Sequence, residues 1–405
     1  MRERLLVIGN GMAGLRFVEE VLQRHAGRFA ITVVGKEPEP AYNRVLLSSL
    51  LAREVCEADI RLRDRGWYDR NAVDLITGDA VTALDPEGRG ARLASGQVIG
   101  FDLAVLATGS QPVRPPIEGN DLPGVVTFRD LDDIEAMQGV APGSRAVVVG
   151  GGLLGIEAAY GLARAGLRVT LLHLKSRLMD RQLDDRAAAL LLAAIEAKGI
   201  EVALGADSAA VSGTSRAEAV MLKDGRAFPA DMVVFAIGIR PETELARSGG
   251  LACNRGIVVD DALATSAPGI WAIGECAEHR GQVYGLVEPA YAQARVLAER
   301  LTGHDSRFEG AVLATNLKVS GVHVFSAGDF LGGGDAENIL LCDPGLRTYR
   351  KLVIRRDAGE QRLVGAVLVG DTADGLWYLD LIRTGAPVGS MRGDLIFGRH
   401  FVDAA

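Results

Sequence analysis

Short apolar runs alternate with amphipathic stretches along the first half of the chain. The segments at 4–9 ("RLLVIG") and 29–35 ("FAITVVG") are apolar, and the residues between them repeat apolar positions at helical spacing. The order strand, helix, strand describes a βαβ unit, and strands without polar alternation are typical of a parallel sheet covered on both faces. A second unit of the same order begins at Arg145, with "RAVVVGG" and "LRVTLLHL" as its strands.

Later segments divide the chain further. The proline-rich residues 111–124 are typical of a linker. From residue 311 the pattern changes to strands of period two, with a D-A-G-E turn at 357–360 and a helix at 373–385. We therefore predict an α/β protein with two Rossmann-like dinucleotide-binding domains and a small α+β C-terminal domain. The predicted boundaries are 1–112 with 245–310 for the first domain, 113–244 for the second and 311–405 for the third.

Composition places the chain among globular proteins of two or three domains. It has 405 residues, 48% of them hydrophobic, and its 52 acidic and 44 basic side chains give a formal charge of −8. An acidic chain without basic clusters argues against nucleic acid as the main partner. The N-terminal residues lack the pattern of a signal peptide, and the apolar run at 187–195 is too short to span a bilayer. We therefore expect a cytoplasmic protein without a membrane partner.

Each βαβ unit carries a glycine pattern between its first strand and its helix. The glycines are Gly9, Gly11 and Gly14 in the first unit and Gly150, Gly152 and Gly155 in the second. The first glycine permits a tight turn, the second lets a pyrophosphate approach the backbone, and the third lets the helix pack closely on the strand. One such pattern could be an ordinary glycine turn. Two in this context predict two dinucleotides, FAD on the first and NAD(P)H on the second, with hydride passing from nicotinamide to flavin.

The residues expected to contact the two riboses are unusual. A carboxylate about 20 residues after the turn ordinarily binds the ribose hydroxyls. In the first unit Lys36 occupies the expected position and Glu37 follows it, whereas in the second His173 occupies it, followed by Lys175 and Arg177. Either Glu37 takes the FAD ribose or that contact is altered. The two later cations favour a 2′-phosphate, and hence NADPH or dual use, unless they only belong to a solvated turn.

Four further segments extend the pattern to a known family. They are 103–112 ("LAVLATGSQP"), 233–241 ("VVFAIGIRP"), 265–279 ("TSAPGIWAIGECAEH") and 285–294 ("GLVEPAYAQA"). Together with the two turns they resemble the pyridine nucleotide–disulfide oxidoreductases, which are FAD-dependent reductases that use NAD(P)H as the electron donor. More narrowly, "GNGMAGLRFVEE", "PAYNRVLLSSLL" and the C-terminal "YRKLVIRRD" are similar to the FAD/NAD part of the large subunit of assimilatory NAD(P)H nitrite reductases. They are also similar to the electron-transfer subunits of assimilatory nitrate reductases.

The resemblance implies a set of cofactor-binding residues in each domain. For FAD they are Gly9, Gly11, Met12, Ala13, Gly14, Glu37, Arg44, Ser48, Val81, Ala107, Thr108, Gly109, Gly274, Glu275 and Pro289. For NAD(P) they are Gly150, Gly152, Leu153, Leu154, Gly155, Glu157, His173, Lys175, Ala236 and Gly238. Glu157 would point toward the nicotinamide, unless it is an exposed helix carboxylate. Beyond the flavin, the resemblance implies no catalytic residue and no metal.

The resemblance also implies an electron-acceptor protein as the partner, such as a nitrate or nitrite reductase component, and allows a homodimer. The C-terminal domain would shield the flavin and help to form the docking or dimer surface. The sequence contains no cysteine-rich [2Fe–2S] segment and no sirohaem-binding part, so we expect that this chain does not reduce nitrite alone.

Other reductase classes remain as alternatives. A rubredoxin or ferredoxin reductase shares the same half-reaction, and a flavin-based redox sensor would bind both cofactors without turnover. A cysteine-dependent disulfide reductase, NADH oxidase or peroxidase is disfavoured, because no C-x-x-C pair is present and Ser48 and Ser49 stand where such enzymes need a cysteine. The four cysteines, which we expect to be mostly small buried side chains, are Cys56, Cys253, Cys276 and Cys342.

Overall fold

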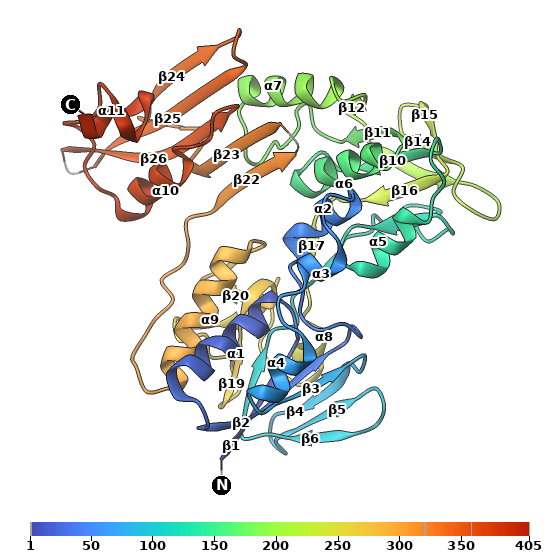
Figure 1. The fold of residues 1–405 in the computed structure, drawn as a ribbon, viewed down its shortest axis with the longest axis vertical. Helices are drawn as coiled ribbons and strands as arrows, with labels where there is room; N and C mark the ends of the chain where they lie inside the picture. The colour runs from blue at the N-terminus through green and yellow to red at the C-terminus, as the bar shows by residue number, and fades with distance from the viewer. Residues whose placement is uncertain (1, 320, 358, 405) are drawn as a thin grey trace. The chain divides into compact units, whose positions relative to one another are not determined.

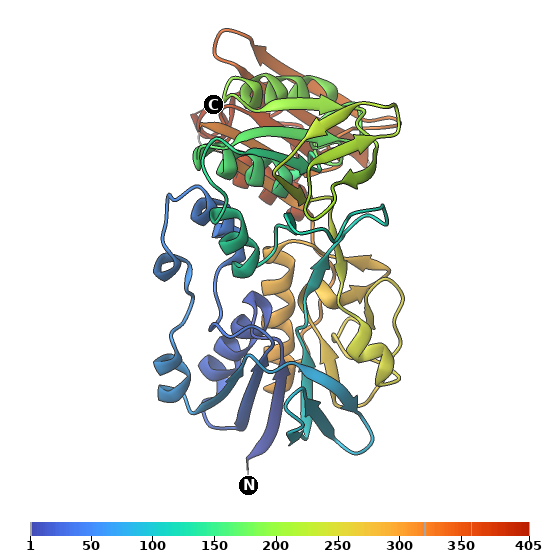
Figure 2. The same ribbon diagram turned by 90° about the vertical axis from the view of Figure 1, so that its right-hand side faces the viewer.

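The computed structural model describes residues 2–319, 321–357 and 359–404. The chain folds into two compact units (Figures 1 and 2). Unit 1 comprises Met1–Leu47, Val55–Pro112 and Ile239–Ala311, and unit 2 comprises Ser48–Glu54, Val113–Gly238 and Val312–Ala405. Each unit contains one of the two βαβ units predicted from the sequence.

The core of unit 1 is a five-stranded parallel sheet in the order β19-β7-β1-β2-β3. Its strands are β1 (Glu3–Ile8), β2 (Phe29–Gly35), β3 (Val73–Thr77), β7 (Leu103–Leu106) and β19 (Ile270–Ala272). Strands β1 and β7 are buried over most of their length, as expected for apolar strands covered on both faces. Helices α1 (Met12–His25) and α9 (Val287–Leu301) pack against each other and contribute to the same hydrophobic core.

Shorter elements complete unit 1. Strands β8 (Ser110–Pro112) and β17 (Ile239–Pro241) pair antiparallel where the chain leaves and re-enters the unit. The other strands are β4 (Val81–Asp85), β5 (Gly90–Leu93), β6 (Val98–Gly100), β18 (Ile257–Val259), β20 (Ala277–His279) and β21 (Gln282–Val283). The short helices are η1 (Arg44–Leu46), α3 (Glu57–Ile60), α4 (Arg65–Arg70), α8 (Glu244–Ser248) and η2 (Gly274–Cys276), and α2 (Leu47–Leu51) continues into unit 2.

The first part of unit 2 repeats the architecture of unit 1. Its parallel sheet has the order β12-β11-β10-β16-β9. The strands are β9 (Val125–Thr127), β10 (Arg145–Val149), β11 (Arg168–His173), β12 (Glu201–Leu204) and β16 (Met232–Phe235), with helices α5 (Leu131–Gln138), α6 (Leu153–Arg164) and α7 (Asp185–Glu196). Strands β13 (Ser208–Ser212), β14 (Ala219–Leu222) and β15 (Ala227–Pro229) form a small antiparallel sheet.

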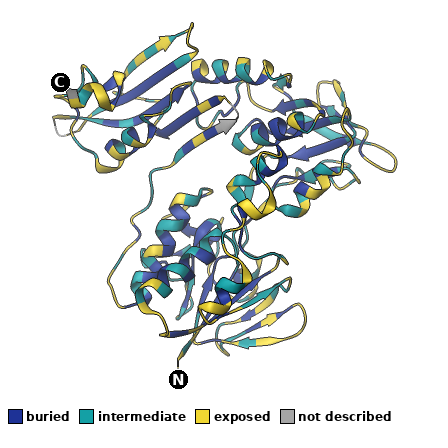
Figure 3. Ribbon diagram, in the orientation of Figure 1, coloured by how far each residue is buried: buried dark blue, intermediate teal, exposed yellow. Residues whose placement is uncertain are grey.

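The C-terminal part of unit 2 is an antiparallel sheet in the order β22-β23-β26-β25-β24. Its strands are β22 (Ala314–Val319), β23 (Val322–Gly328), β24 (Glu337–Asp343), β25 (Thr348–Asp357) and β26 (Glu360–Val369), followed by α10 (Gly375–Thr384), η3 (Leu395–Phe397) and α11 (Arg399–Ala404). Its central strands β25 and β26 are largely buried (Figure 3). Asp357 pairs with Glu360, as the predicted turn requires, although residue 358 of that turn lies outside the described residues.

These elements confirm the predicted fold class, because two parallel α/β sheets are followed by a small α+β part. The division into three domains at the predicted boundaries stays a prediction. Among the described residues, no helix is long and apolar enough to cross a membrane.

Candidate dinucleotide sites

The first glycine turn connects β1 to α1 and leaves no room for side chains at two of its three glycines. Gly9 has a φ of +118°, and a Cβ atom added there would overlap the carbonyl oxygen of Ala107. A Cβ atom at Gly14 would overlap the carbonyl oxygen of Gly9. At Gly11, by contrast, a Cβ atom would meet no atom within 4 Å. The outer two glycines therefore serve packing, whereas the middle one leaves the backbone open to a ligand.

The second glycine turn, between β10 and α6, has the same construction. Gly150 has a φ of +123°, and a Cβ atom there would overlap the carbonyl oxygen of Ala236. A Cβ atom at Gly155 would overlap the carbonyl oxygen of Gly150, and one at Gly152 would again meet no atom within 4 Å. The two turns are therefore equivalent, and both have an open middle position.

The helices that follow the two turns lack side-chain caps. Gly11 and Gly152 are the N-cap residues of α1 and α6, and neither helix has a side chain that accepts hydrogen bonds from its first N–H groups. Helices α4, α5 and α7 are instead capped by Asp64, Asp130 and Asp184. The uncapped N–H groups and the positive end of the helix dipole suit a phosphate group. Both turns thus fit the pyrophosphate of a dinucleotide.

Several predicted FAD residues meet at the carboxyl edge of the unit 1 sheet. Ala107, Thr108 and Gly109 follow β7, and Gly274 and Glu275 follow β19. The ends of parallel strands share one edge of a sheet, so these residues lie on the same edge as the first glycine turn. A Cβ atom at Gly274 would lie 2.9 Å from the Cβ atom of Ala13, which shows how closely the β19 end approaches α1.

Side chains missed by the sequence reading hold this edge together. Ser110 donates a hydrogen bond to Glu275 (2.7 Å), and the backbone N–H of Gly274 donates to Oε1 of Gln293 (2.7 Å). The Nδ2 atom of Asn10 and the Nε2 atom of Gln293 are buried without a hydrogen-bond partner among the described residues. Such unsatisfied donors suit a polar ligand at this edge. Ser110 and Gln293 both belong to segments that carry the family resemblance, 103–112 and 285–294, but the sequence did not indicate their hydrogen-bond partners.

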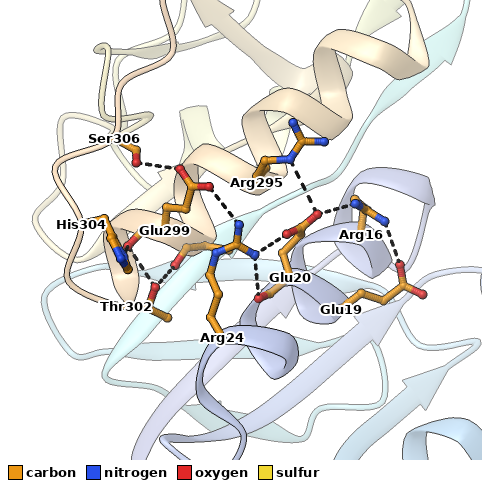
Figure 4. A network of polar contacts seen from close by, with 10 residues as sticks. Arg16, Glu19, Glu20, Arg24, Arg295, Glu299, Thr302, His304 and Ser306 are labelled. Carbon is orange, nitrogen blue, oxygen red and sulfur yellow. Dashed lines mark hydrogen bonds and ion pairs between the residues drawn. The ribbon is translucent and has the colours of Figure 1, made fainter.

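A network of charged side chains fixes α1 against α9 (Figure 4). Glu20 on α1 is only 3% exposed and forms ion pairs with Arg16 and Arg24 on its own helix. Arg24 continues to Glu299 on α9 at 2.9 Å, and Arg295 on α9 lies 3.9 Å from Glu20. The network couples the helix of the first glycine turn to the helix whose first turn holds Pro289. It therefore stabilises the arrangement of two predicted FAD-binding elements.

Glu37, the carboxylate nearest the predicted ribose position, is already engaged. It accepts a hydrogen bond from the Tyr42 hydroxyl (2.6 Å) and forms an ion pair with Arg44, while Lys36 points to solvent. Burial alone would raise the pKa of Glu37, but the Arg44 guanidinium and the Tyr42 hydroxyl hold that pKa below its ordinary value. Glu37, and not Lys36, is therefore the residue beside the end of β2 that offers an ionised carboxylate to a ligand.

Two predicted FAD residues lie apart from the main group. Val81 begins β4, the first strand of the antiparallel sheet of unit 1. Ser48 lies on the part of α2 that belongs to unit 2, where its hydroxyl hydrogen-bonds Glu157 of α6. The structure therefore places Ser48 with the residues predicted for the second site.

Glu157 is partly buried and carries a strongly perturbed pKa. Burial raises the pKa of its carboxyl to about 7, although the hydrogen bond from Ser48 opposes the rise. Its neighbours on α6 are also covered by α2: a Cβ atom at Gly161 would lie 2.8 Å from Leu51, and Tyr160 reaches Glu54 at 3.4 Å. Glu157 is therefore not the freely exposed helix carboxylate that the sequence left open.

The residues at the end of β11 surround the second glycine turn. His173 accepts a hydrogen bond at Nδ1 from the backbone N–H of Gly151 (3.0 Å), and its Nε2 lies 3.3 Å from Asp180. Burial lowers the pKa of His173, although Asp180 opposes the change, so the imidazole is neutral near pH 7. Arg177 is bound to Asp185 at 2.9 Å, and Lys175 is exposed.

The remaining predicted residues of the second site lie close to its glycines in the chain. Leu153 and Leu154 form the first turn of α6, with Leu154 exposed, and Ala236 and Gly238 follow β16. Among the described residues there is no group of three or more His, Cys, Asp or Glu side chains that could hold a metal ion. All of the second-site residues belong to unit 2, and all of the FAD residues except Ser48 belong to unit 1.

The sequence matches two known families. Residues 3–294 match the family described as pyridine nucleotide-disulphide oxidoreductase, and residues 314–386 match the rubredoxin NAD+ reductase C-terminal domain. The first match includes both glycine turns, and the second covers most of the antiparallel C-terminal sheet together with α10. These matches confirm the family resemblance predicted from the motifs.

Individual relatives agree with the family match. The chain is 43% identical to a nitrite reductase [NAD(P)H] of Bacillus subtilis (strain 168), over 96% of this chain and 48% of the relative. It is 40% identical to the assimilatory nitrate reductase electron transfer subunit of the same organism, over 94% of this chain and 49% of the relative. The chain thus spans about half the length of the curated relatives it matches.

Among solved structures, the chain is similar to one from the covalent putidaredoxin reductase–putidaredoxin complex. The TM-score is 0.85 at 25% sequence identity, and the match covers 95% of this chain and 94% of the other. The solved chain is therefore similar to the present chain over nearly the whole length of both, including the C-terminal part.

Proposed function

Because the chain belongs to the pyridine nucleotide-disulphide oxidoreductase family, whose members use FAD and NAD(P)H, we propose that it takes electrons from NAD(P)H onto FAD and passes them to a redox partner protein. One observation carries this proposal. The chain has two equivalent glycine turns, each followed by an uncapped helix and each open only at its middle glycine. A protein that bound one dinucleotide would need only one of them.

In this proposal unit 1 holds FAD and unit 2 holds the nicotinamide dinucleotide. Gly11 and the first N–H groups of α1, from Met12 onward, would bind the FAD pyrophosphate, and Gly152 and α6 would bind that of NAD(P)H. The residues that would complete the FAD site are Ala13, Glu37, Arg44, Val81, Ala107, Thr108, Gly109, Gly274, Glu275 and Pro289. When bound, FAD supplies the two-electron acceptor for hydride and a route for electrons to leave.

The protein residues contribute orientation and electrostatics. The Glu37–Arg44 pair presents a fixed carboxylate at the end of β2, where an adenosine ribose offers two hydroxyl donors. Burial raises the pKa of the Glu157 carboxyl to about 7, so its protonated form is available near neutral pH and would meet a nicotinamide amide at less cost than a fully ionised buried carboxylate. A hydride donor and acceptor need accurate placement above all, and rigid glycine turns supply such placement.

The expectation that the cysteines are mostly buried is wrong: Cys276 is buried, Cys253 is partly buried, and Cys56 and Cys342 are exposed. Cysteine chemistry nevertheless has no support at Cys276 or in the segment of Ser48 and Ser49. Burial raises the pKa of the Cys276 thiol, and its Sγ donates to the carbonyl oxygens of Ile273 (3.2 Å) and Leu106 (3.4 Å). Such a thiol is a poor nucleophile. Ser48 and Ser49 occupy the segment where a peroxidatic cysteine would be needed. We therefore do not assign a disulfide reductase or peroxidase activity.

The proposed acceptor is a component of nitrate or nitrite assimilation, because the relatives with 40–43% identity carry those names. A ferredoxin or rubredoxin is the alternative acceptor, favoured by the C-terminal family match and by the likeness to a putidaredoxin reductase. In either case the C-terminal part, 311–405, would contribute to the docking surface, or to a dimer.

Anaerobic titration tests the proposal. The FAD-loaded chain is titrated with NADH and then with NADPH while the flavin absorbance is recorded. We expect complete bleaching at one equivalent of the preferred donor, followed by recovery when an oxidised [2Fe–2S] ferredoxin is added. No bleaching with either donor would contradict the proposal and favour a redox sensor that binds both dinucleotides without hydride transfer.

A further inference from the structure

The loop between β11 and α7 is bonded to the second glycine turn through Gly151, the residue before Gly152. The backbone N–H of Gly151 donates to Nδ1 of His173 (3.0 Å), and its carbonyl oxygen accepts from the N–H of Met179 (2.8 Å). A Cβ atom at Gly151 would lie 2.6 Å from Leu178 and 2.7 Å from His173. The loop therefore packs directly beside the open position where a pyrophosphate would approach the backbone.

Met179 takes up a backbone conformation that residues with side chains rarely adopt. Its φ is +48°, in the left-handed region, and the residue is fully buried. Its carbonyl oxygen accepts hydrogen bonds from the N–H groups of Gln182 (2.8 Å) and Leu183 (2.9 Å). Such conformations persist only where the surrounding contacts fix them, and they are common at sites that hold ligands. The position of Gly151 therefore depends on what fixes the end of this loop, at Leu183.

The end of the loop is fixed by the C-terminal sheet. Asp184, the residue after Leu183, caps α7 by accepting a hydrogen bond at Oδ1 from the N–H of Ala187 (3.0 Å). Its Oδ2 accepts a hydrogen bond from the hydroxyl of Tyr349 (2.7 Å) and lies 3.4 Å from Nζ of Lys351. Tyr349 and Lys351 belong to β25, and both are buried. One carboxylate thus joins the start of α7 to a strand that is distant in the sequence.

Packing alone does not account for a polar contact at this place. Helix α7 already contacts β23 and β26, and Tyr349 and Lys351 lie opposite the buried Val369 and Val367 of β26. Burying an ammonium group and a carboxylate costs solvation that apolar side chains of similar size would not cost. The ammonium group also donates to the carbonyl oxygen of Leu331 (3.0 Å). The polar contact adds direction, because a carboxylate bound at both oxygens holds the cap of α7 in one orientation.

We propose that Tyr349 and Lys351 are positioning residues of the second dinucleotide site, and that they act on Gly151 through Asp184 and the loop that precedes it. The proposal rests on the proposed function, because it takes the second glycine turn as the site of the NAD(P)H pyrophosphate. It extends that function, because the C-terminal sheet then contributes to dinucleotide binding as well as to acceptor docking or a dimer. A displaced turn would present its N–H groups to the pyrophosphate in poorer geometry.

Binding of ADP to the full-length chain with FAD bound tests the proposal, because ADP carries the adenosine and pyrophosphate that the second turn would hold. Isothermal titration calorimetry compares the wild type with the double variant Tyr349→Phe/Lys351→Met. This variant leaves Oδ2 of Asp184 without either partner and keeps the cap of α7. We expect ADP to bind about tenfold more weakly to the double variant and roughly threefold more weakly to Tyr349→Phe alone.

Anaerobic flavin reduction gives a second readout, which a general loosening of the chain would not produce. The apparent dissociation constant of the preferred donor should rise about tenfold in the double variant, while the limiting rate of reduction stays within about twofold of wild type. Arg350→Met is the matched control, because Arg350 is the buried cation between the two proposed residues on β25. Its side chain points to the opposite face of the sheet and binds Asp374 at 3.0 Å. Its loss should leave ADP affinity near that of the wild type, even where it lowers the free energy of unfolding.

Three results would overturn the proposal. The first is a double variant that binds ADP as tightly as the wild type. The second is an equal loss of ADP affinity in Arg350→Met, because the cause would then be a general loosening of the C-terminal sheet. The third is a wild-type chain that binds no ADP. If the double variant does not fold, Tyr349→Phe alone is judged by the same criteria.

The same measurements separate this proposal from the proposed function. If NAD(P)H bleaches the wild-type flavin while any of these three results is found, the proposed function stands and only the role of Tyr349 and Lys351 fails. If the wild type binds no ADP and neither donor bleaches the flavin, both fail together.

Discussion

Replacing Glu157 by Gln should change how the stability of the protein depends on pH. Burial raises the pKa of this carboxyl from 4.5 to about 7, so the folded state binds its proton where the unfolded state has released it. Between pH 4.5 and about pH 7 the free energy of unfolding falls as pH rises. The reason is that the Glu157 carboxyl releases its proton readily in the unfolded chain but holds it in the folded protein. Glutamine carries no titrating proton, so this contribution disappears in the variant.

The size of the effect follows from the two pKa values. Each pKa unit corresponds to about 1.4 kcal/mol, so the full contribution of Glu157 is on the order of 3 kcal/mol. It is fully present below about pH 4.5 and lost above about pH 7. We therefore expect the wild-type free energy of unfolding to fall by about 2 kcal/mol more than that of the Glu157→Gln variant between pH 5 and pH 8.

Urea unfolding at fixed temperature, followed by fluorescence, provides the assay. Taking the difference between wild type and variant at each pH cancels the titration of all other groups that the mutation leaves unchanged. Glu196→Gln is the matched control, because Glu196 is an exposed glutamate at the end of α7 in the same unit. Ser48→Ala adds an internal check: it removes a hydrogen bond that lowers the pKa of Glu157, so the fall in stability should begin at the same pH and extend further.

Equal pH dependence in wild type and Glu157→Gln would refute this reasoning. It would mean that Glu157 is solvated in solution and that α2 does not cover it as described. The reasoning would also be refuted if Glu196→Gln changed the pH dependence of the unfolding free energy as much as Glu157→Gln does, because an exposed helix carboxylate should contribute little.

Three further substitutions test other parts of the structure by urea unfolding. Asp184→Ala should destabilise the protein by about 3–5 kcal/mol, because Asp184 caps α7 and is also the carboxylate 3.4 Å from the buried ammonium group of Lys351. Glu20→Ala should cost about 1–3 kcal/mol, because three arginines lose their shared buried partner. Gly155→Ala should cost roughly 1–3 kcal/mol or more, because its methyl group would overlap the Gly150 carbonyl oxygen. A change below about 0.5 kcal/mol, the range of ordinary surface substitutions, would contradict each prediction.

Local sequence patterns were sufficient for the two dinucleotide turns and their sheets. The glycine spacing predicts them because no other residue tolerates the φ of +118° at Gly9 or the overlap at Gly14. Uninterrupted apolar strands predict the parallel sheets for a similar reason, since both faces must be buried. These constraints act within about 30 residues, so they are visible in one stretch of sequence.

Contacts between distant segments were not visible in the same way. Nothing in the sequence places Ser48 beside Glu157, because their meeting depends on how α2 packs on α6 in unit 2. The sequence likewise predicts Arg177 as a candidate for a 2′-phosphate, yet Asp185 at the start of α7 takes its guanidinium. Side-chain pairing of this kind is decided by tertiary packing, so only the residue types, and not their partners, could be inferred.

The central claim is that the two glycine turns bind different dinucleotides, and a pair of alanine variants tests it most directly. Gly11 and Gly152 have negative φ and open space at the Cβ position, so alanine should fold normally at both while filling the proposed cradles. The measurement is the FAD content per chain together with the rate of anaerobic flavin reduction by NADPH. Gly11→Ala should weaken FAD binding by about tenfold or more, whereas Gly152→Ala should keep its FAD and be reduced about tenfold more slowly at limiting NADPH. If Gly152→Ala loses FAD, or if Gly11→Ala keeps it with wild-type affinity, the assignment of one dinucleotide to each turn is contradicted.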